Sequence, residues 1–213
     1  RDPRFALTVL HPGQSFNGRI YNTLDETVNG KKNPDFWSEA AAPRTGLSMK
    51  KYLKVVPSSE FGNCDANIPV IRLAEVYLTY AEAAEKVGTA EEKKLALDLI
   101  NLIRGRVNHV KATALTEDLV RRERRVELCF EGLWYYDVKR WNLGPTELGQ
   151  PLYGTAYGSV NNTTGEITWN KKDGKLQYIK VEDRTFITDR NYLFMIPQAE
   201  MDANPNMTQN KGY

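Results

Sequence analysis

The chain has 213 residues, of which 41% are hydrophobic and 26% charged, and its 29 basic and 27 acidic side chains leave a formal charge of +2. This length can bury a sizeable core in one domain or slightly more. The nearly balanced charge argues against a nucleic-acid binder, which would carry a basic footprint. No apolar stretch approaches the roughly 20 residues of a membrane-spanning helix, so a transmembrane helix is excluded.

The first segment, residues 1–67, is rich in Pro, Gly, Asn and Ser and shows no long periodicity. Two short apolar runs, residues 5–10 and 52–56, are bounded by turn residues and are predicted as strands. Long irregular stretches in a compact domain usually serve a function or lie against a larger body. We therefore expect this segment to be rich in loops.

Residues 68–142 are predicted to be helical. Pro69 suits a first helical turn, Gly88 ends the pattern, and Thr89 is a suitable cap for a second helix. Helical spacing predicts one apolar stripe on each helix: Leu73, Val76, Tyr77, Tyr80, Ala81 and Ala84 on the first, and Leu95, Leu99, Leu102, Ile103 and Val107 on the second. Two amphipathic helices joined by a short turn predict a helical hairpin.

A third helix is predicted to begin near Thr116 and to end at Gly132, with Leu119, Val126 and Phe130 turned inward. Residues 143–213 return to loops. Asp173-Gly174 lies between two apolar runs and predicts a hairpin with a tight turn, and residues 192–196 are predicted as a strand before a polar tail. The predicted fold class is mainly α, with helical pairs, long loop excursions and a small β-hairpin.

Three carboxylates on the third helix, Glu123, Glu127 and Glu131, are spaced by four residues and share one face. A glycosidase needs two carboxyl groups across the scissile bond, but such pairs normally converge from different elements. The alternative is a structural ion-pair network with arginines of adjoining segments. We favour the network, with these candidate partners: Arg72, Arg104, Arg106 and Arg140.

Other catalytic patterns are weaker. Ser48 and Lys51 have the Ser-x-x-Lys spacing, but the motifs that accompany it in serine hydrolases are absent. His11 and His109 are isolated and are expected to be structural or exposed, since a zinc site needs three or four ligands. Cys129 sits in an apolar run and is predicted to be a small buried hydrophobe. We predict no catalytic residue, no metal and no cofactor.

Several aromatic residues fall outside the helical periodicity, in loops or in the predicted hairpin. Flat rings stack on apolar faces of ligands, sugars included, and Tyr and Trp also suit protein interfaces. The alternative is that these rings fill gaps between loops and helices. The predicted ligand-binding residues are Trp37, Trp169 and Tyr178.

Six segments, in order along the chain, carry a family resemblance. Residues 71–83 (IRLAEVYLTYAEA) and 96–106 (ALDLINLIRGR) are followed by residues 123–132 (ERRVELCFEG), then YDVKRW at 136–141, and the chain closes with YLFMIP at 192–197 and TQNKGY at 208–213. Together they resemble the SusD/RagB family, whose motifs read R-x-AE-x-x-L-x-YAEA, A-x-x-x-IN-x-IR-x-R, ERR-x-EL-x-FEG and I-P-x-x-E with TQN-x-GY.

The resemblance implies that residues 1–213 are the C-terminal part of a longer SusD-like protein with tetratricopeptide-like helical pairs. Such proteins are lipid-anchored at the outer-membrane surface and bind glycans or other nutrients for a SusC-like TonB-dependent transporter, without catalysis. The lipobox cysteine and the N-terminal portion are not in this sequence. Because the resemblance implies glycan binding, an oligosaccharide is the expected ligand. The alternative is that this part contacts the transporter, with ligand contacts elsewhere or a cargo that is not a carbohydrate.

Overall fold

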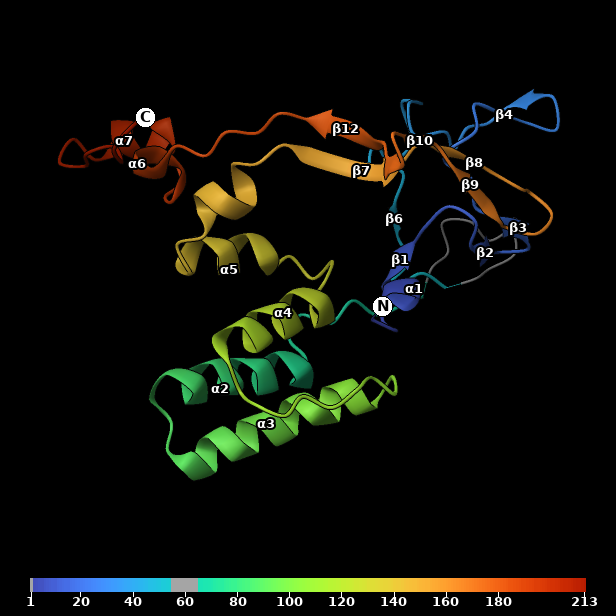
Figure 1. The fold of residues 1–213 in the computed structure, drawn as a ribbon. Helices are drawn as coiled ribbons and strands as arrows, with labels where there is room; N and C mark the ends of the chain where they lie inside the picture. The colour runs from blue at the N-terminus through green and yellow to red at the C-terminus, as the bar shows by residue number, and fades with distance from the viewer. Residues whose placement is uncertain (1, 55–64) are drawn as a thin grey trace. The chain divides into compact units, whose positions relative to one another are not determined.

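The computed structural model describes residues 2–54 and 65–213, so residues 55 and 56 of the predicted strand 52–56 lie outside the described part. The chain divides into two compact units (Figure 1). The first contains Arg1–Trp134 and Gly154–Ile179, and the second contains Tyr135–Tyr153 and Lys180–Tyr213.

Helices and short antiparallel strand pairs build both units, which confirms the predicted mainly helical class. The helices are α1 (Phe5–Thr8), α2 (Leu73–Val87), α3 (Ala90–Gly105), α4 (Glu117–Glu127), α5 (Trp134–Arg140), the π-helical turn η2 (Gly144–Leu148), α6 (Thr188–Asn191) and α7 (Gln198–Ala203). The strands pair as β1 (Val9–Leu10) with β6 (Ser48–Met49), β2 (Ser15–Phe16) with β3 (Arg19–Ile20), β4 (Thr27–Val28) with β5 (Lys31–Lys32), β7 (Leu152–Ala156) with β12 (Tyr178–Glu182), β8 (Gly158–Val160) with β9 (Ile167–Trp169), and β10 (Lys171–Lys172) with β11 (Lys175–Leu176).

Capping residues set the ends of the helices in the first unit. Gly88 ends α2, and the Thr89 and Glu92 side chains form a reciprocal capping box at the start of α3. The Thr116 hydroxyl accepts from the backbone N–H of Leu119 and caps α4. These three predicted boundaries are confirmed. The prediction for Pro69 is wrong, because α2 begins only at Leu73.

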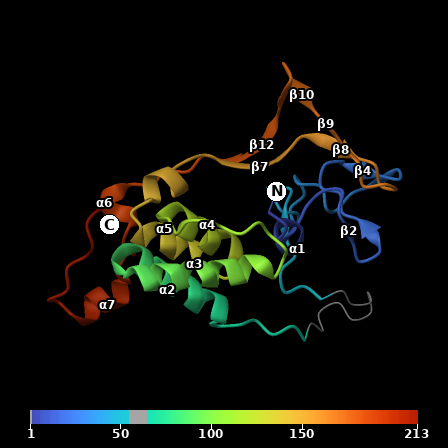
Figure 2. The same cartoon turned by 60° about the horizontal axis from the view of Figure 1, so that its bottom comes forward.

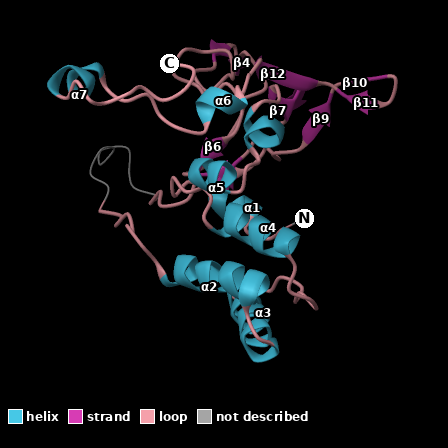
Figure 3. Ribbon diagram, turned by 90° about the vertical axis from the view of Figure 1, so that its left-hand side faces the viewer, coloured by secondary structure: helices cyan, strands magenta, loops and turns pink. Residues whose placement is uncertain are grey.

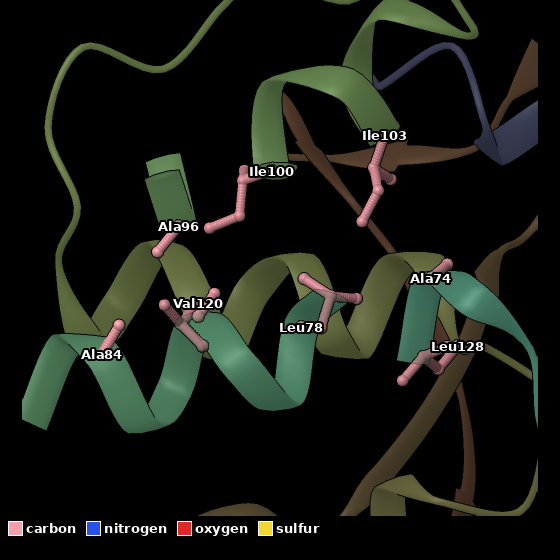
Figure 4. Packing of buried hydrophobic residues seen from close by; sticks show 9 residues of the cluster. Ala74, Leu78, Ala84, Ala96, Ile100, Ile103, Val120 and Leu128 are labelled. Carbon is pink, nitrogen blue, oxygen red and sulfur yellow. The ribbon is translucent and has the colours of Figure 1, made fainter. Parts of the chain in front are cut away.

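The core of the first unit lies between α2, α3 and α4 (Figures 1, 2 and 4). Alanine is prominent at the contact because a small side chain lets neighbouring helices approach closely. The buried residues are Ala74, Leu78, Ala81, Ala84, Ala96, Ile100, Ile103, Val120 and Leu128. The core thus uses small residues on two helices and larger aliphatic residues opposite them.

The predicted apolar stripes are correct only in part. Leu73 and Leu102 are 61% and 58% exposed, and Val76 and Leu95 are also exposed. Phe130, predicted to turn inward, is exposed as well. In α2 and α3 the reason is that apolar residues occupy two faces, and the face with alanines packs against the neighbouring helices. Phe130 is exposed because it lies beyond the end of α4, where its φ of 64° breaks the helical pattern.

Two predicted strands are corrected, and residues 52–54 of a third form no strand, because Tyr52 lies in a turn with a φ of 66°. Residues 5–8 form the helical turn α1, and only Val9–Leu10 are extended. A short apolar run does not by itself distinguish helix from strand. Residues 192–196 form no strand, because their backbone groups pair with side-chain amides: Asn210 Nδ2 donates to the Phe194 carbonyl, and Gln209 binds both the N–H and the carbonyl of Ile196.

The predicted hairpin is confirmed. Lys171 pairs with Leu176 and Lys172 with Lys175, and Figure 3 shows β10 and β11 at the end of the hairpin, beyond β9. The two turn residues, Asp173 and Gly174, have φ values of 52° and 74°. Positive φ at both positions is the requirement of a type I′ turn, which Asp-Gly satisfies.

Candidate functional site

A cavity of about 560 Å³ lies within the first unit and is lined almost entirely by apolar and aromatic side chains. Its lining residues are Phe5, His11, Pro12, Leu47, Thr155, Ala156, Gly165, Ile167, Trp169, Leu176 and Tyr178. Two of the predicted ligand-binding residues, Trp169 and Tyr178, therefore line one cavity although they come from different strands. Concave, mostly apolar sites with a few polar groups are the usual form of a ligand pocket.

The N-terminal segment supplies one side of this cavity. The Phe5 and His11 rings stack with centroids 5.4 Å apart, and β1 pairs with β6, which brings Leu47 to the same place. His11 Nδ1 lies 2.8 Å from the Pro12 carbonyl oxygen. Because a carbonyl oxygen only accepts, Nδ1 donates in this bond, and Nε2 of the neutral ring is an acceptor.

Two glycines hold this segment against the β8–β9 hairpin. Gly13 and Gly165 both have φ of 79°, and a Cβ on either residue would collide with the carbonyl oxygen of the other. Glycine is the residue that combines this left-handed conformation with so close a backbone approach. The contact places His11 beside Ile167 in the cavity lining.

Trp169 owes its position to the residue opposite it. It pairs with Gly158 across β8 and β9, and its Cε3 lies 3.3 Å from where a Gly158 Cβ would be. The missing side chain leaves room for the indole over the neighbouring strand. Trp169 is 36% exposed and Tyr178 is 54% exposed. In residues 2–54 and 65–213 neither the Trp169 indole N–H nor the Tyr178 hydroxyl has a hydrogen-bond partner, so both polar ends are available to a ligand.

Trp37, the third predicted residue, lies outside the lining of this cavity. Its ring meets Tyr157 edge to face at 6.0 Å, and its backbone N–H donates to the Thr23 carbonyl. Tyr157 directly precedes Gly158, and adjacent residues along an extended chain point to opposite faces. Trp37 therefore contacts the face of the β8–β9 hairpin that is opposite to the face carrying Trp169.

Sequence reasoning missed Phe5 and His11 as site residues. The apolar run 5–10 predicts a strand for Phe5, and the isolated His11 is predicted to be structural or exposed. The composition of the loop carries no signal for this role, because the approach of Gly13 to Gly165 is what brings these rings to the hairpin.

The third helix, predicted to end at Gly132, ends at Glu127, so Glu123 and Glu127 lie on α4 and Glu131 lies beyond its end. The three carboxylates form an ion-pair network. Glu123 pairs with Arg104 and Arg4, Glu127 with Arg72, Arg106 and Arg4, and Glu131 with Arg72 and Lys51. The predicted partners Arg72, Arg104 and Arg106 are confirmed, and Arg140 instead pairs with Asp137. Arg4 and Lys51 were not predicted, and they tie the N-terminal segment to α4.

The network favours the ionised form of the Glu127 and Glu131 carboxyl groups. Burial by itself would raise the pKa of Glu127 and of Glu131. Hydrogen bonds from Arg72 and Arg106 outweigh this effect on Glu127, and hydrogen bonds from Arg72 and Lys51 outweigh it on Glu131. The pKa of both carboxyl groups is therefore lowered. A hydrogen bond from Arg4 lowers the pKa of Asp2 to about 2. A general acid would need a raised pKa, so this network has a structural character.

The other candidate groups have partners that do not suit catalysis. The Ser48 hydroxyl lies 2.6 Å from the Tyr21 hydroxyl, whereas Lys51 Nζ donates to the Glu127 carbonyl at 2.8 Å. The Ser-x-x-Lys spacing therefore does not create a serine–lysine pair. His109 lies beside Asp2, and Cys129 is half-buried, with burial raising the pKa of its thiol. Cys64 lies outside the described residues.

Within residues 2–54 and 65–213, no helix has the length and apolar character needed to cross a bilayer. Comparison with known proteins gives relatives described as SusD or SusD-like proteins. A Bacteroides ovatus SusD-like protein is 38% identical over 79 residues, which cover 37% of this chain and 14% of the relative. The starch-binding protein SusD of Bacteroides thetaiotaomicron is 30% identical over 173 residues, covering 79% of this chain and 26% of the relative.

A comparison with solved structures also gives a SusD-like protein. The chain matches a SusD-like carbohydrate-binding protein from Bacteroides fragilis with a TM-score of 0.73 and 34% identity, covering 98% of this chain and 42% of the other. The chain thus spans about a quarter or less of the two curated relatives. The sequence profile of the SusD family matches residues 1–213. This profile match covers every residue of the cavity and of the ion-pair network, and the chain belongs to the SusD family.

Proposed function

We propose that this chain forms part of a glycan-binding protein without catalytic activity, and that its cavity holds part of an oligosaccharide. The observation that carries the proposal is the cavity with the exposed rings of Trp169 and Tyr178 in its lining. A relative named as a starch-binding protein and a structural neighbour named as carbohydrate-binding support the ligand class.

The chemistry of the lining fits a sugar. Pyranose rings have an apolar face of C–H groups that stacks on aromatic rings, and a rim of hydroxyls that donate and accept hydrogen bonds. Here the rings of Phe5, Trp169 and Tyr178 offer surface for stacking. His11 Nε2 accepts from a hydroxyl, and the Tyr178 hydroxyl both donates and accepts.

The wider role in this proposal is nutrient uptake. The protein would be held at the outer-membrane surface by a lipid anchor and would pass oligosaccharide to a SusC-like TonB-dependent transporter. The family membership supports this role, which we extend from the family to this chain.

The test is a screen of the full-length protein against a glycan panel, followed by isothermal titration of each hit. We expect Trp169→Ala and Tyr178→Ala each to weaken binding about tenfold, in line with the loss of one stacked ring. Trp37→Ala is the comparison variant, and an equal loss there would extend the site to the opposite face of the hairpin. Saturable binding that survives both Trp169→Ala and Tyr178→Ala would overturn the assignment of the cavity.

The second candidate is an interaction role. The outer face of α2 and α3 carries a groove lined by Leu73, Tyr77, Leu102 and Arg106, and its leucines are exposed. Exposed apolar patches of this kind mark contact surfaces. A transporter complex weakened by Leu73→Ser, together with glycan affinity unchanged by Trp169→Ala, would favour this role over glycan binding.

A further inference from the structure

The β10–β11 hairpin tip places one cation on the cavity side of the hairpin. Lys171 is directly opposite Leu176, and directly opposed residues of an antiparallel pair share a face. Leu176 lines the cavity together with Tyr178, two residues further along. Lys171 therefore lies at the rim of the cavity, immediately beyond its lining.

No acidic side chain among residues 2–54 and 65–213 lines the cavity, so the described lining does not neutralise this cation. In the part of the chain that the structure describes, Lys171 takes part in no ion pair, and Asp173 in the turn is likewise unpaired. A cation with no partner beside an aromatic cavity is free to pair with a ligand.

The rest of the tip adds to the positive charge. Lys172 and Lys175 are directly opposite each other, an arrangement of like charges that destabilises a strand pair. They lie on the other face, because successive residues of a strand alternate. The tip thus concentrates three lysines around one aspartate at a cost to its own stability.

We propose that the cavity binds an acidic oligosaccharide and that Lys171 recognises its anionic group, a uronate carboxylate or a sulfate. The proposal rests on the proposed glycan-binding function. A ring stacked on Trp169 or Tyr178 would leave its substituents at the rim, within reach of the Lys171 ammonium group. The lysine pair on the opposite face would raise the local concentration of the anion without contacting the bound sugar.

The experiment measures affinity for matched ligand pairs by isothermal titration of the full-length protein at low and high salt. The first pair is oligogalacturonate and its methyl ester. The second is carrageenan oligosaccharide and its desulfated form. We expect the charged member of at least one pair to bind more tightly at low salt, and added salt to reduce the difference.

Two lysine variants separate direct recognition from general attraction. Lys171→Gln is expected to reduce the preference for the charged member about fivefold. Lys175→Gln makes the same change of charge on the other face of the same hairpin and should leave the preference nearly unchanged. Trp169→Ala should weaken the charged and the neutral member alike.

Three outcomes would overturn the proposal. Equal affinity for the charged and the neutral member of both pairs would overturn it. Equal effects of Lys171→Gln and Lys175→Gln on the preference would overturn it as well. Binding of neutral glycans with no binding of either pair would also overturn it, while the proposed glycan-binding function would stand. The absence of binding to any glycan in the panel would contradict that function itself.

Discussion

Like charges four residues apart on one helix repel each other, and α4 carries two such carboxylates, Glu123 and Glu127, with Glu131 just beyond its end. Their repulsion is offset because each meets at least two cations from outside α4. Glu127 is the centre of the network, with Arg4, Arg72 and Arg106 around it. The helix therefore depends on parts of the chain far away in sequence.

Removing the central carboxylate should destabilise the protein. Glu127→Ala removes one carboxylate partner from each of the Arg4 and Arg72 guanidinium groups, and we expect the free energy of unfolding to fall by about 3–5 kcal/mol. Urea denaturation measures this change. Glu127→Gln keeps the side-chain shape and some hydrogen bonds, and should cost less.

A control for this substitution is Glu26→Ala, which truncates an exposed glutamate outside the network. It should leave the urea midpoint unchanged. An unchanged midpoint for Glu127→Ala would mean that the network contributes nothing measurable to stability.

At the scale of the element, α2 and α3 each have an inner face and an outer face that both carry apolar residues. Leu78 is fully buried on the inner face, whereas Leu102 is 58% exposed on the outer face. Leu78→Ala should therefore lower the free energy of unfolding by about 2–5 kcal/mol because it leaves a cavity.

Leu102→Ala makes the same chemical change on the outer face of the neighbouring helix. It should cost less than about 1 kcal/mol, as surface substitutions do. Thermal or urea unfolding of the two variants checks the difference. Equal losses would show that the outer face is covered in solution.

This pair of leucines also shows how far sequence patterns predict the fold. Periodicity and capping residues located α2, α3 and α4, because Thr89 and Thr116 act locally. The buried face was misplaced because periodicity alone does not distinguish two apolar faces of one helix. Trp169 and Tyr178 could be proposed from residue type, but their shared cavity depends on Gly13 and Gly165, whose contact joins distant segments.

The turn of the β10–β11 hairpin offers a second prediction at the scale of the element. Gly174 has a φ of 74°, a conformation that costs an L-residue about 1–2 kcal/mol. Gly174→Ala should lower the free energy of unfolding by about that amount and loosen the register that places Lys171.

The matched substitution is Gly105→Ala at the end of α3, where a Cβ would meet open space. Helical alanine is favoured over glycine by about 0.5–1 kcal/mol, so this variant should be more stable. In urea denaturation we expect the free energy of unfolding to fall for Gly174→Ala and to rise for Gly105→Ala. A stabilised Gly174→Ala variant would contradict the assigned turn.

For the whole molecule, the network makes folding stability depend on pH. The pKa of Asp2 is lowered to about 2, first by its hydrogen bond from Arg4, and the pKa values of Glu127 and Glu131 are lowered by their cationic partners despite burial. In the unfolded chain such carboxyl groups titrate near pH ~4. The unfolded state therefore binds more protons than the folded state between these values, and the folded state loses stability as the pH falls.

The full contribution of these carboxylates is expected above about pH 5, with a progressive loss toward about pH 2. Urea midpoints measured across this range should fall steadily in the native sequence. In Glu127→Gln the fall should be shallower, because that variant lacks one of the carboxyl groups that must be protonated. The arginine partners keep their charge throughout, so the slope reports the carboxylates alone. A midpoint that is constant from neutral pH to pH ~3, or a slope that Glu127→Gln leaves unaltered, would show that the charges of the network do not contribute to the stability of the fold.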